Sequence, residues 1–262
     1  MTTAEPTRKV NALEDLLADL SPTLSLLPRI EGIINKEEPT LEDILEVCSH
    51  DPKLLGKLTR RAGFAGSETD FARDVLFKKG LGFLKSLAIR SMNQEIFEVE
   101  MPNSDLNPSI LKKRCVILAR FIKSFNDDLQ VDPDEAYLAG LFYNYDYVCY
   151  ELLQAQQDEQ FVSFDENAEH YGLLASQALA SFGFKSVVTD AVEDAKKEFF
   201  HTRLPFAHAL LRIANETLAN TEQTSVSIGR GPNPDRELVD ATGMRVRKIF
   251  AILKDISRNY SV

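Results

Sequence analysis

The sequence predicts an all-α protein of two packed helical lobes. Apolar residues recur at intervals of three and four along most of the chain, as they do on one face of a helix, and no segment alternates as a half-buried strand does. Helix start signals such as Asp-Pro precede several of these segments. One polar segment, residues 99–108, separates two runs of helices. We therefore expect a polar tail over residues 1–10, a first lobe over 11–104 and a second lobe over 105–262.

In the first lobe, proline and capping residues set the expected helix starts. Pro28 suits the first turn of a helix, where the missing N–H of proline loses no hydrogen bond. Thr40 is a good N-cap, and Asp43 stands where the carboxylate of a capping box is found. Gly80 separates the last two helices of this lobe. The expected helices cover residues 12–20, 28–34, 41–50, 51–63, 75–79 and 81–97.

The second lobe contains longer predicted helices. Pro108 begins the first of them, and Pro133 begins one that we expect to continue without interruption to Leu153. A loop rich in Gly, Pro and Ser covers residues 221–232. The expected helices cover residues 108–125, 133–153, 166–182, 185–197, 205–218, 235–242 and 244–258. On the first of these, the side chains expected to be buried are Ile110, Val116, Ile117, Leu118 and Phe121.

Composition narrows the class of protein. The chain of 262 residues is 44% hydrophobic and 27% charged, which is ordinary for a globular protein. Its formal net charge of −10 disfavours non-specific binding to nucleic acid or to anionic membranes. Cys48, Cys115 and Cys149 have no CxxC spacing and are typical of small core residues in a reducing compartment. No apolar stretch approaches about 18 residues and no secretory signal is evident, so we expect a cytoplasmic protein without membrane insertion.

Six segments carry a resemblance to a known family. They are TLEDILEVCSHDPKLLGKLTRRAGFAG and DVLFKKGLGFLKSLAIRSM in the first lobe, then ILKKRCVILARFI, DEAYLAGLFYNYDYV, EHYGLLASQALASFGF and FAHALLRIANETLA in the second. In this order, and over about residues 13–258, the chain resembles the HDOD domain family, which comprises degenerate bacterial signalling relatives of HD-type metal-dependent phosphohydrolases. The resemblance implies an HDOD-like helical fold whose second lobe is HD-like, and a role in signal transduction through protein binding.

The resemblance also identifies where the metal ligands of HD proteins are replaced. Those proteins carry a histidine on the helix similar to residues 110–121, a His-Asp doublet on the next and an aspartate on the helix similar to residues 206–218. The positions that this chain offers are Lys113, Tyr143, Asn144 and Asn215. None of these side chains is a usual ligand of a hard divalent cation, and a lysine there repels one. The expectation is a protein that is not an enzyme and that needs no cofactor or metal.

Two alternatives stay open at the same place. In the first alternative, the chain is a receptor that binds a nucleotide or another small anion in the pocket left by the missing ligands. In the second, it keeps a residual metal-dependent phosphohydrolase activity. The alignment places Lys112, Lys113 or Arg114 at the first ligand position. His170 is a further candidate, since the family packing places it beside the pocket. The candidate pocket residues are therefore Lys112, Lys113, Arg114, Tyr143, Asn144, His170 and Asn215.

A basic stripe on the expected helix over residues 51–63 is the candidate for partner binding. It consists of Lys53, Lys57, Arg60 and Arg61, which recur at helical spacing within an acidic chain. The stripe is either a solvated helix face or a surface that docks an acidic protein partner, for which complementary charge speeds and orients association.

Overall fold

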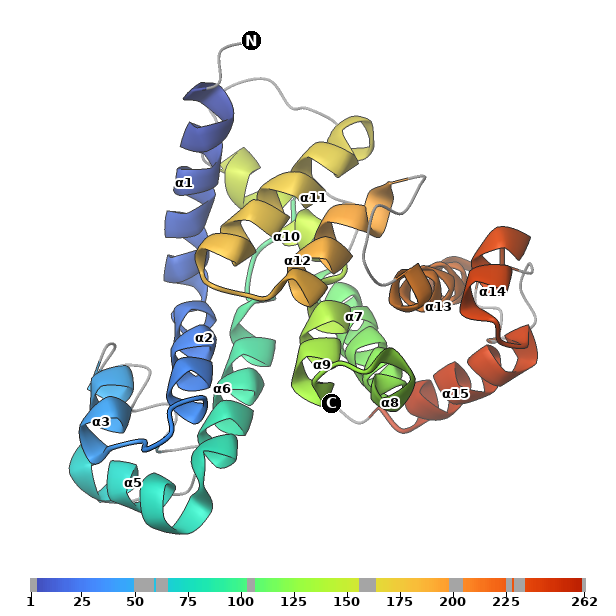
Figure 1. Ribbon diagram of the computed structural model, residues 1–262. Helices are drawn as coiled ribbons and strands as arrows, with labels where there is room; N and C mark the ends of the chain where they lie inside the picture. The colour runs from blue at the N-terminus through green and yellow to red at the C-terminus, as the bar shows by residue number, and fades with distance from the viewer. Residues whose placement is uncertain are drawn as a thin grey trace. The chain divides into compact units, whose positions relative to one another are not determined.

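Helices make up every regular element of the chain that is described, which confirms the predicted all-α class (Figure 1). The computed structural model describes residues 4–49, 59, 66–102, 107–155, 164–197, 205–224, 228 and 234–260. Within these residues, no helix combines the length and the apolar composition needed to cross a bilayer.

The chain divides into two compact units. Unit 1 contains Met1–Leu13, Val99–Ala180 and Phe184–Val262, and unit 2 contains Glu14–Glu98 with Ser181–Gly183. The main division falls at Val99, where the polar segment of residues 99–108 begins.

Unit 2 is built around the packing of α2 against α6. Its elements are the end of α1 (Ala4–Leu20), α2 (Thr23–Ile34), α3 (Leu41–Ser49), α5 (Glu68–Asp74), the π-helix η1 (Val75–Lys79) and α6 (Leu81–Glu95). The capping box before α3 is confirmed: the N–H of Asp43 donates to Thr40 Oγ1 at 3.2 Å, and the N–H of Thr40 donates to Asp43 Oδ2 at 2.9 Å. Gly80, with φ of 82°, takes the left-handed backbone that joins η1 to α6.

Two predicted helix starts in this part of the chain are wrong. Helix α1 begins at Ala4 and not at residue 12; Pro6 lies in its first turn, where the missing N–H loses no hydrogen bond. Helix α2 begins at Thr23, so that Pro28 lies inside it. The hydrogen bond that Pro28 cannot donate costs stability, but the helix buries apolar side chains before and after the proline. These are Leu24, Leu26, Leu27, Ile30 and Ile33.

A buried carboxylate ties the start of α2 to the end of α6. Glu95 is 3% exposed and accepts hydrogen bonds from the hydroxyls of Ser21, Thr23 and Ser91, at 2.9, 2.8 and 2.9 Å. The three hydroxyl donors satisfy the oxygens of this buried side chain and join the start of α2 to the end of α6.

Unit 1 contains the longer helices and the core that positions the candidate site. Its elements are the start of α1, α7 (Pro108–Lys123), α8 (Asn126–Leu129), α9 (Pro133–Phe142), α10 (Tyr145–Ala155), α11 (Phe164–Ser181), α12 (Ser186–Glu193), the 3-10 helix η2 (Asp194–Lys196), α13 (Pro205–Thr224), α14 (Arg236–Thr242) and α15 (Val246–Arg258). Helix α9 packs between α7 and α12, while α13 contacts α7, α14 and α15.

The pairing of α7 with α9 is unusually close at one point. A Cβ atom on Gly140 of α9 would lie 2.6 Å from Ala119 Cα, Ala119 N and the Leu118 carbonyl oxygen, all backbone atoms of α7. The helices therefore touch through their backbones here, and only glycine fits.

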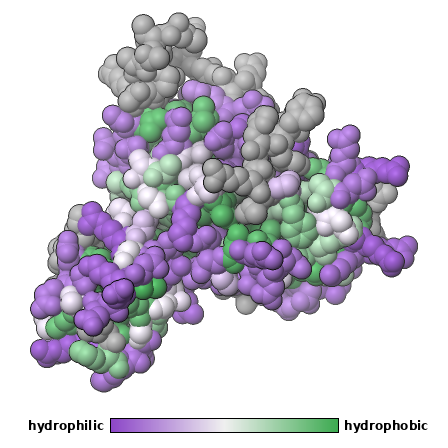
Figure 2. Space-filling view, viewed as in Figure 1, coloured by the Kyte–Doolittle hydropathy of each residue, from purple (hydrophilic) through white to green (hydrophobic). Residues whose placement is uncertain are grey.

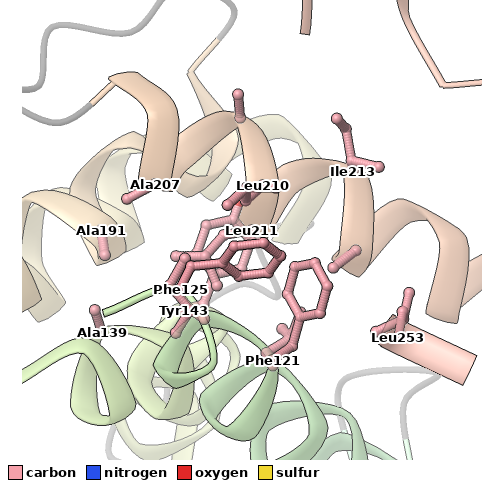
Figure 3. Close-up of a cluster of buried hydrophobic side chains, with 14 of the residues drawn as sticks. Phe121, Phe125, Ala139, Tyr143, Ala191, Ala207, Leu210, Leu211, Ile213 and Leu253 are labelled. Atoms are coloured by element: carbon pink, nitrogen blue, oxygen red, sulfur yellow. The ribbon is translucent and has the colours of Figure 1, made fainter. Parts of the chain in front are cut away.

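A cluster of apolar side chains from α7, α9, α12, α13 and α15 fills the centre of unit 1 (Figure 3). Phe121 and Phe125 make an edge-to-face contact with ring centroids 5.2 Å apart, and α15 contributes Ile249 and Leu253, both fully buried. Val116, Ile117, Leu118 and Phe121 are buried as predicted. Ile110 is 41% exposed, so its predicted burial is wrong; it lies in the first turn of α7, outside the packed part of the helix.

The surface seen in Figure 2 is mostly hydrophilic, with smaller hydrophobic areas between the charged side chains. Among the described residues, the large apolar side chains that are exposed are Ile34, Phe77, Ile110 and Leu173.

Candidate functional site

The helix predicted over residues 133–153 is interrupted at Tyr143 and Asn144, two of the candidate pocket residues. Helix α9 ends at Phe142, and α10 begins at Tyr145. Tyr143 and Asn144 thus form the turn between them, and both are buried. The prediction of one continuous helix is wrong because the chain turns where these side chains enter the core.

Asn144 is joined directly to Asn215. Its Nδ2 donates to Asn215 Oδ1 of α13 at 2.9 Å, and the Asn144 side chain is fully buried. Two of the candidate pocket residues, 71 positions apart in the sequence, therefore meet. Both amides are neutral at every pH of interest, so the pair provides a bond between helices without any charge to attract a cation.

Tyr143 lies in the apolar cluster of unit 1, among side chains of α7, α12 and α13 (Figure 3). Burial raises the pKa of its phenol, which therefore stays protonated. In this position the side chain acts as part of the core.

The three basic candidates on α7 have separate surroundings. Arg114 is 5% exposed and forms an ion pair with Glu222 of α13, in which Arg114 Nε lies 3.1 Å from Glu222 Oε2. Lys113 is exposed, with its Nζ 6.0 Å from the centre of the Tyr260 ring, and Lys112 is half-buried. The sequence did not predict Glu222 as the partner of Arg114, because Glu222 falls in the loop predicted over residues 221–232, whereas α13 continues to Thr224.

Cys115 lies next to this amide pair. Burial raises the pKa of its thiol to about 12, although Arg114 and hydrogen bonding with Asn144 act in the opposite direction. Burial also raises the pKa of the Cys149 thiol. Both cysteines are free and buried, as the sequence predicted for core residues, and thiols that stay protonated are poor nucleophiles.

The remaining sequence candidates are not brought to this site. His170 is on the exposed part of α11, where its ring makes an edge contact with Tyr171 at 5.8 Å. Lys53, Lys57, Arg60 and Arg61 lie outside the described residues. Within the part of the chain that is described, no group of three or more His, Cys, Asp or Glu side chains is arranged to hold a metal ion.

A cavity of about 330 Å³ opens elsewhere in unit 1, and none of the candidate pocket residues lines it. Its walls come from α7, α8, α9, α12 and α13 and from the segment between α8 and α9. The polar side chains in its lining are Gln130, Ser186, Asp190 and His208. His208 is 2% exposed, and burial lowers the pKa of its imidazole to about 4, with Lys197 acting in the same direction and Asp194 against it.

The buried His208 makes stability depend on pH. The folded protein keeps this imidazole neutral down to about pH 4, whereas the unfolded chain takes up the proton below about pH 6.5. Because the unfolded state binds more protons between these values, we expect the free energy of unfolding to fall by about 3 kcal/mol from pH 6.5 to pH 4 through this residue. Urea unfolding of the unmutated chain and of His208→Gln over this range measures the difference. If the unfolding free energies of the two proteins change in parallel with pH, the predicted contribution of His208 is contradicted.

Comparisons of the chain with protein-family models, with curated proteins and with solved structures found no match.

Proposed function

We propose that this chain is a cytoplasmic, non-catalytic signalling module of the HDOD type from a bacterium, and that it acts by binding other proteins. The observation that carries the proposal is the hydrogen bond between Asn144 and Asn215. The family resemblance assigns these two positions to metal-binding carboxylates, and in this chain two neutral amides stand there, joined by one hydrogen bond. Asn144 is fully buried, so this position contributes to packing and presents no carboxylate to a metal ion.

Two neighbours of the amide pair support the same proposal. Tyr143, at the position of the doublet histidine, is surrounded by apolar side chains. Arg114 is paired with Glu222, so its charge is already compensated. This pairing also favours the protein-binding module over the nucleotide or anion receptor, because a buried arginine must lose its carboxylate before it can bind an incoming phosphate.

Hydrolysis assays test the non-catalytic part of the proposal. We expect the purified chain to hydrolyse neither a phosphomonoester nor a phosphodiester such as bis(p-nitrophenyl) phosphate, with or without added Mn²⁺ or Mg²⁺, because the described residues contain no ligand set that positions the ion. Asn144→Leu is the control, since it removes the amide. Hydrolysis that chelation abolishes and that Asn144→Leu also abolishes would show a residual phosphohydrolase.

Reversal of charge on the basic stripe tests the protein-binding part. The spacing of Lys53, Lys57, Arg60 and Arg61 in the sequence predicts a solvated helix face, on which each charge contributes about 0–1 kcal/mol. Changing all four to Glu should therefore leave circular dichroism and stability nearly unchanged. The same change should weaken capture of acidic partners from a lysate of the native host, with binding that is sensitive to salt.

A matched variant carries the same number of reversals on α15 and its N-cap. The exposed residues changed to Glu are Arg245, Arg247, Lys248 and Arg258. This variant should recover the same partners as the unmutated chain. If the stripe variant recovers them and the α15 variant does not, the stripe is only a solvated face and the partner surface lies on α15.

A further inference from the structure

The cavity in unit 1 exists because small side chains face it from three different helices. Ala136 and Ala139 belong to α9, Ala191 to α12 and Ala207 to α13, and all four line the cavity. Figure 3 labels three of them, Ala139, Ala191 and Ala207, on separate helices at one side of the apolar cluster. Because each is at most 7% exposed, larger residues at these positions would extend into the interior and fill the space.

Size and lining together limit what the cavity can hold. A cavity of about 150 Å³ with apolar walls takes up benzene, so about 330 Å³ has room for two fused rings. Ile122, Leu129 and Leu211 complete an apolar wall around the alanines. The body of the ligand must therefore be apolar.

The polar part of the lining selects against anions. No lysine or arginine is among the described residues that line the cavity, and Asp190 contributes a half-buried carboxylate. His208 is neutral near pH 7 and so offers hydrogen bonding without positive charge. A phosphate or nucleotide would lose its hydration here and gain no compensating charge.

We propose that this cavity binds a small, uncharged molecule of one or two fused rings whose single hydrogen-bonding group meets His208. This site is separate from the amide pair, and the proposal goes beyond the protein-binding function and does not depend on it. A module of this kind would then receive a chemical signal within the same unit that carries the degenerate site.

Indole is a suitable probe because it combines two fused rings with one N–H donor. The chain contains no tryptophan, so indole fluorescence can be excited selectively in the presence of the protein. We expect saturable binding to the full chain, with a dissociation constant on the order of 0.1–1 mM. Benzothiophene, which has a similar shape and no N–H, should compete for the site more weakly.

Variants that fill the cavity give the decisive comparison. Ala191→Leu and Ala207→Leu should each weaken indole binding about tenfold or more, because the added atoms occupy the ligand volume. Ala241→Leu adds the same atoms at an exposed position of α14 and should bind indole like the unmutated chain. Circular dichroism and urea unfolding establish that each variant is folded. Because Ala191 and Ala207 belong to different helices, each variant tests the cavity separately.

His208 and the charge of the ligand are tested separately. His208→Leu should weaken indole severalfold and leave benzothiophene nearly unchanged, since only indole has a group for the imidazole. Inorganic phosphate and AMP at millimolar concentration should not displace indole. The proposal is overturned if indole does not bind saturably, if it binds equally well to folded filling variants, or if either anion displaces it.

Discussion

Gly140→Ala is expected to destabilise the protein by about 3 kcal/mol, the largest effect of any single methyl group that we foresee. The added Cβ would lie 2.6 Å from three backbone atoms of α7, and none of these atoms can move without displacing the helix. Overpacking against backbone cannot be relieved by a change of rotamer, so α9 and α7 must separate. The separation would also disturb the apolar cluster, to which both helices contribute.

Gly32→Ala is the matched control for this change. Gly32 lies within α2, is exposed, and a Cβ built on it meets nothing within 4 Å. Because alanine loses less backbone entropy than glycine in a helix, this variant should be more stable by about 0.5–1 kcal/mol. Urea unfolding followed by circular dichroism measures both variants. A loss of less than about 1 kcal/mol in Gly140→Ala would mean that the two helices are not in backbone contact.

Replacing both amides of the pair, of which Asn144 is fully buried and Asn215 half-buried, by carboxylates is expected to cost about 3–5 kcal/mol at neutral pH. In Asn144→Asp with Asn215→Asp, two carboxylates would face each other where the amides are 2.9 Å apart. Like charges at that distance raise the pKa of one carboxyl, so the folded double variant binds a proton that the unfolded chain releases above about pH 4. The loss of stability should therefore be small below about pH 4 and should grow as the pH rises through the raised pKa.

The single variant Asn215→Asp is the control for this pair, since its carboxylate can still accept the hydrogen bond from Asn144 Nδ2. We expect it to lose much less stability than the double variant at neutral pH. Equal unfolding free energies for the single and double variants would contradict direct contact between the two side chains.

Helix positions could be predicted from the sequence where a local signal determines them. Thr40 and Asp43 form the predicted capping box, and Asp132 and Asp235 cap α9 and α14 through their carboxylates. Pro28 misled the prediction because its local preference for a first turn is overridden by packing of α2 against α6. Local preference is a weak guide wherever tertiary burial is extensive.

The candidate site was harder to predict from the sequence than the helices were, because its contacts join segments that are distant along the chain. The pairing of Asn144 with Asn215 follows from no local pattern, and only the family resemblance placed the two positions together. Glu222, the partner of Arg114, was missed with the last turn of α13. The cavity was missed because it depends on side-chain volume that Ala136, Ala191 and Ala207 leave empty, and no motif encodes missing volume.

The central claim of the proposal, that the hydrogen bond between Asn144 and Asn215 takes the place of a metal ion, is tested most directly by thermal unfolding with increasing Mn²⁺. A ligand that binds the folded state raises the melting temperature by mass action. We predict no change for the unmutated chain up to millimolar Mn²⁺, and a saturable rise for the double variant Asn144→Asp with Asn215→Asp, whose carboxylates create the missing ligands. A saturable rise in the unmutated chain that Asn144→Leu removes would contradict the claim.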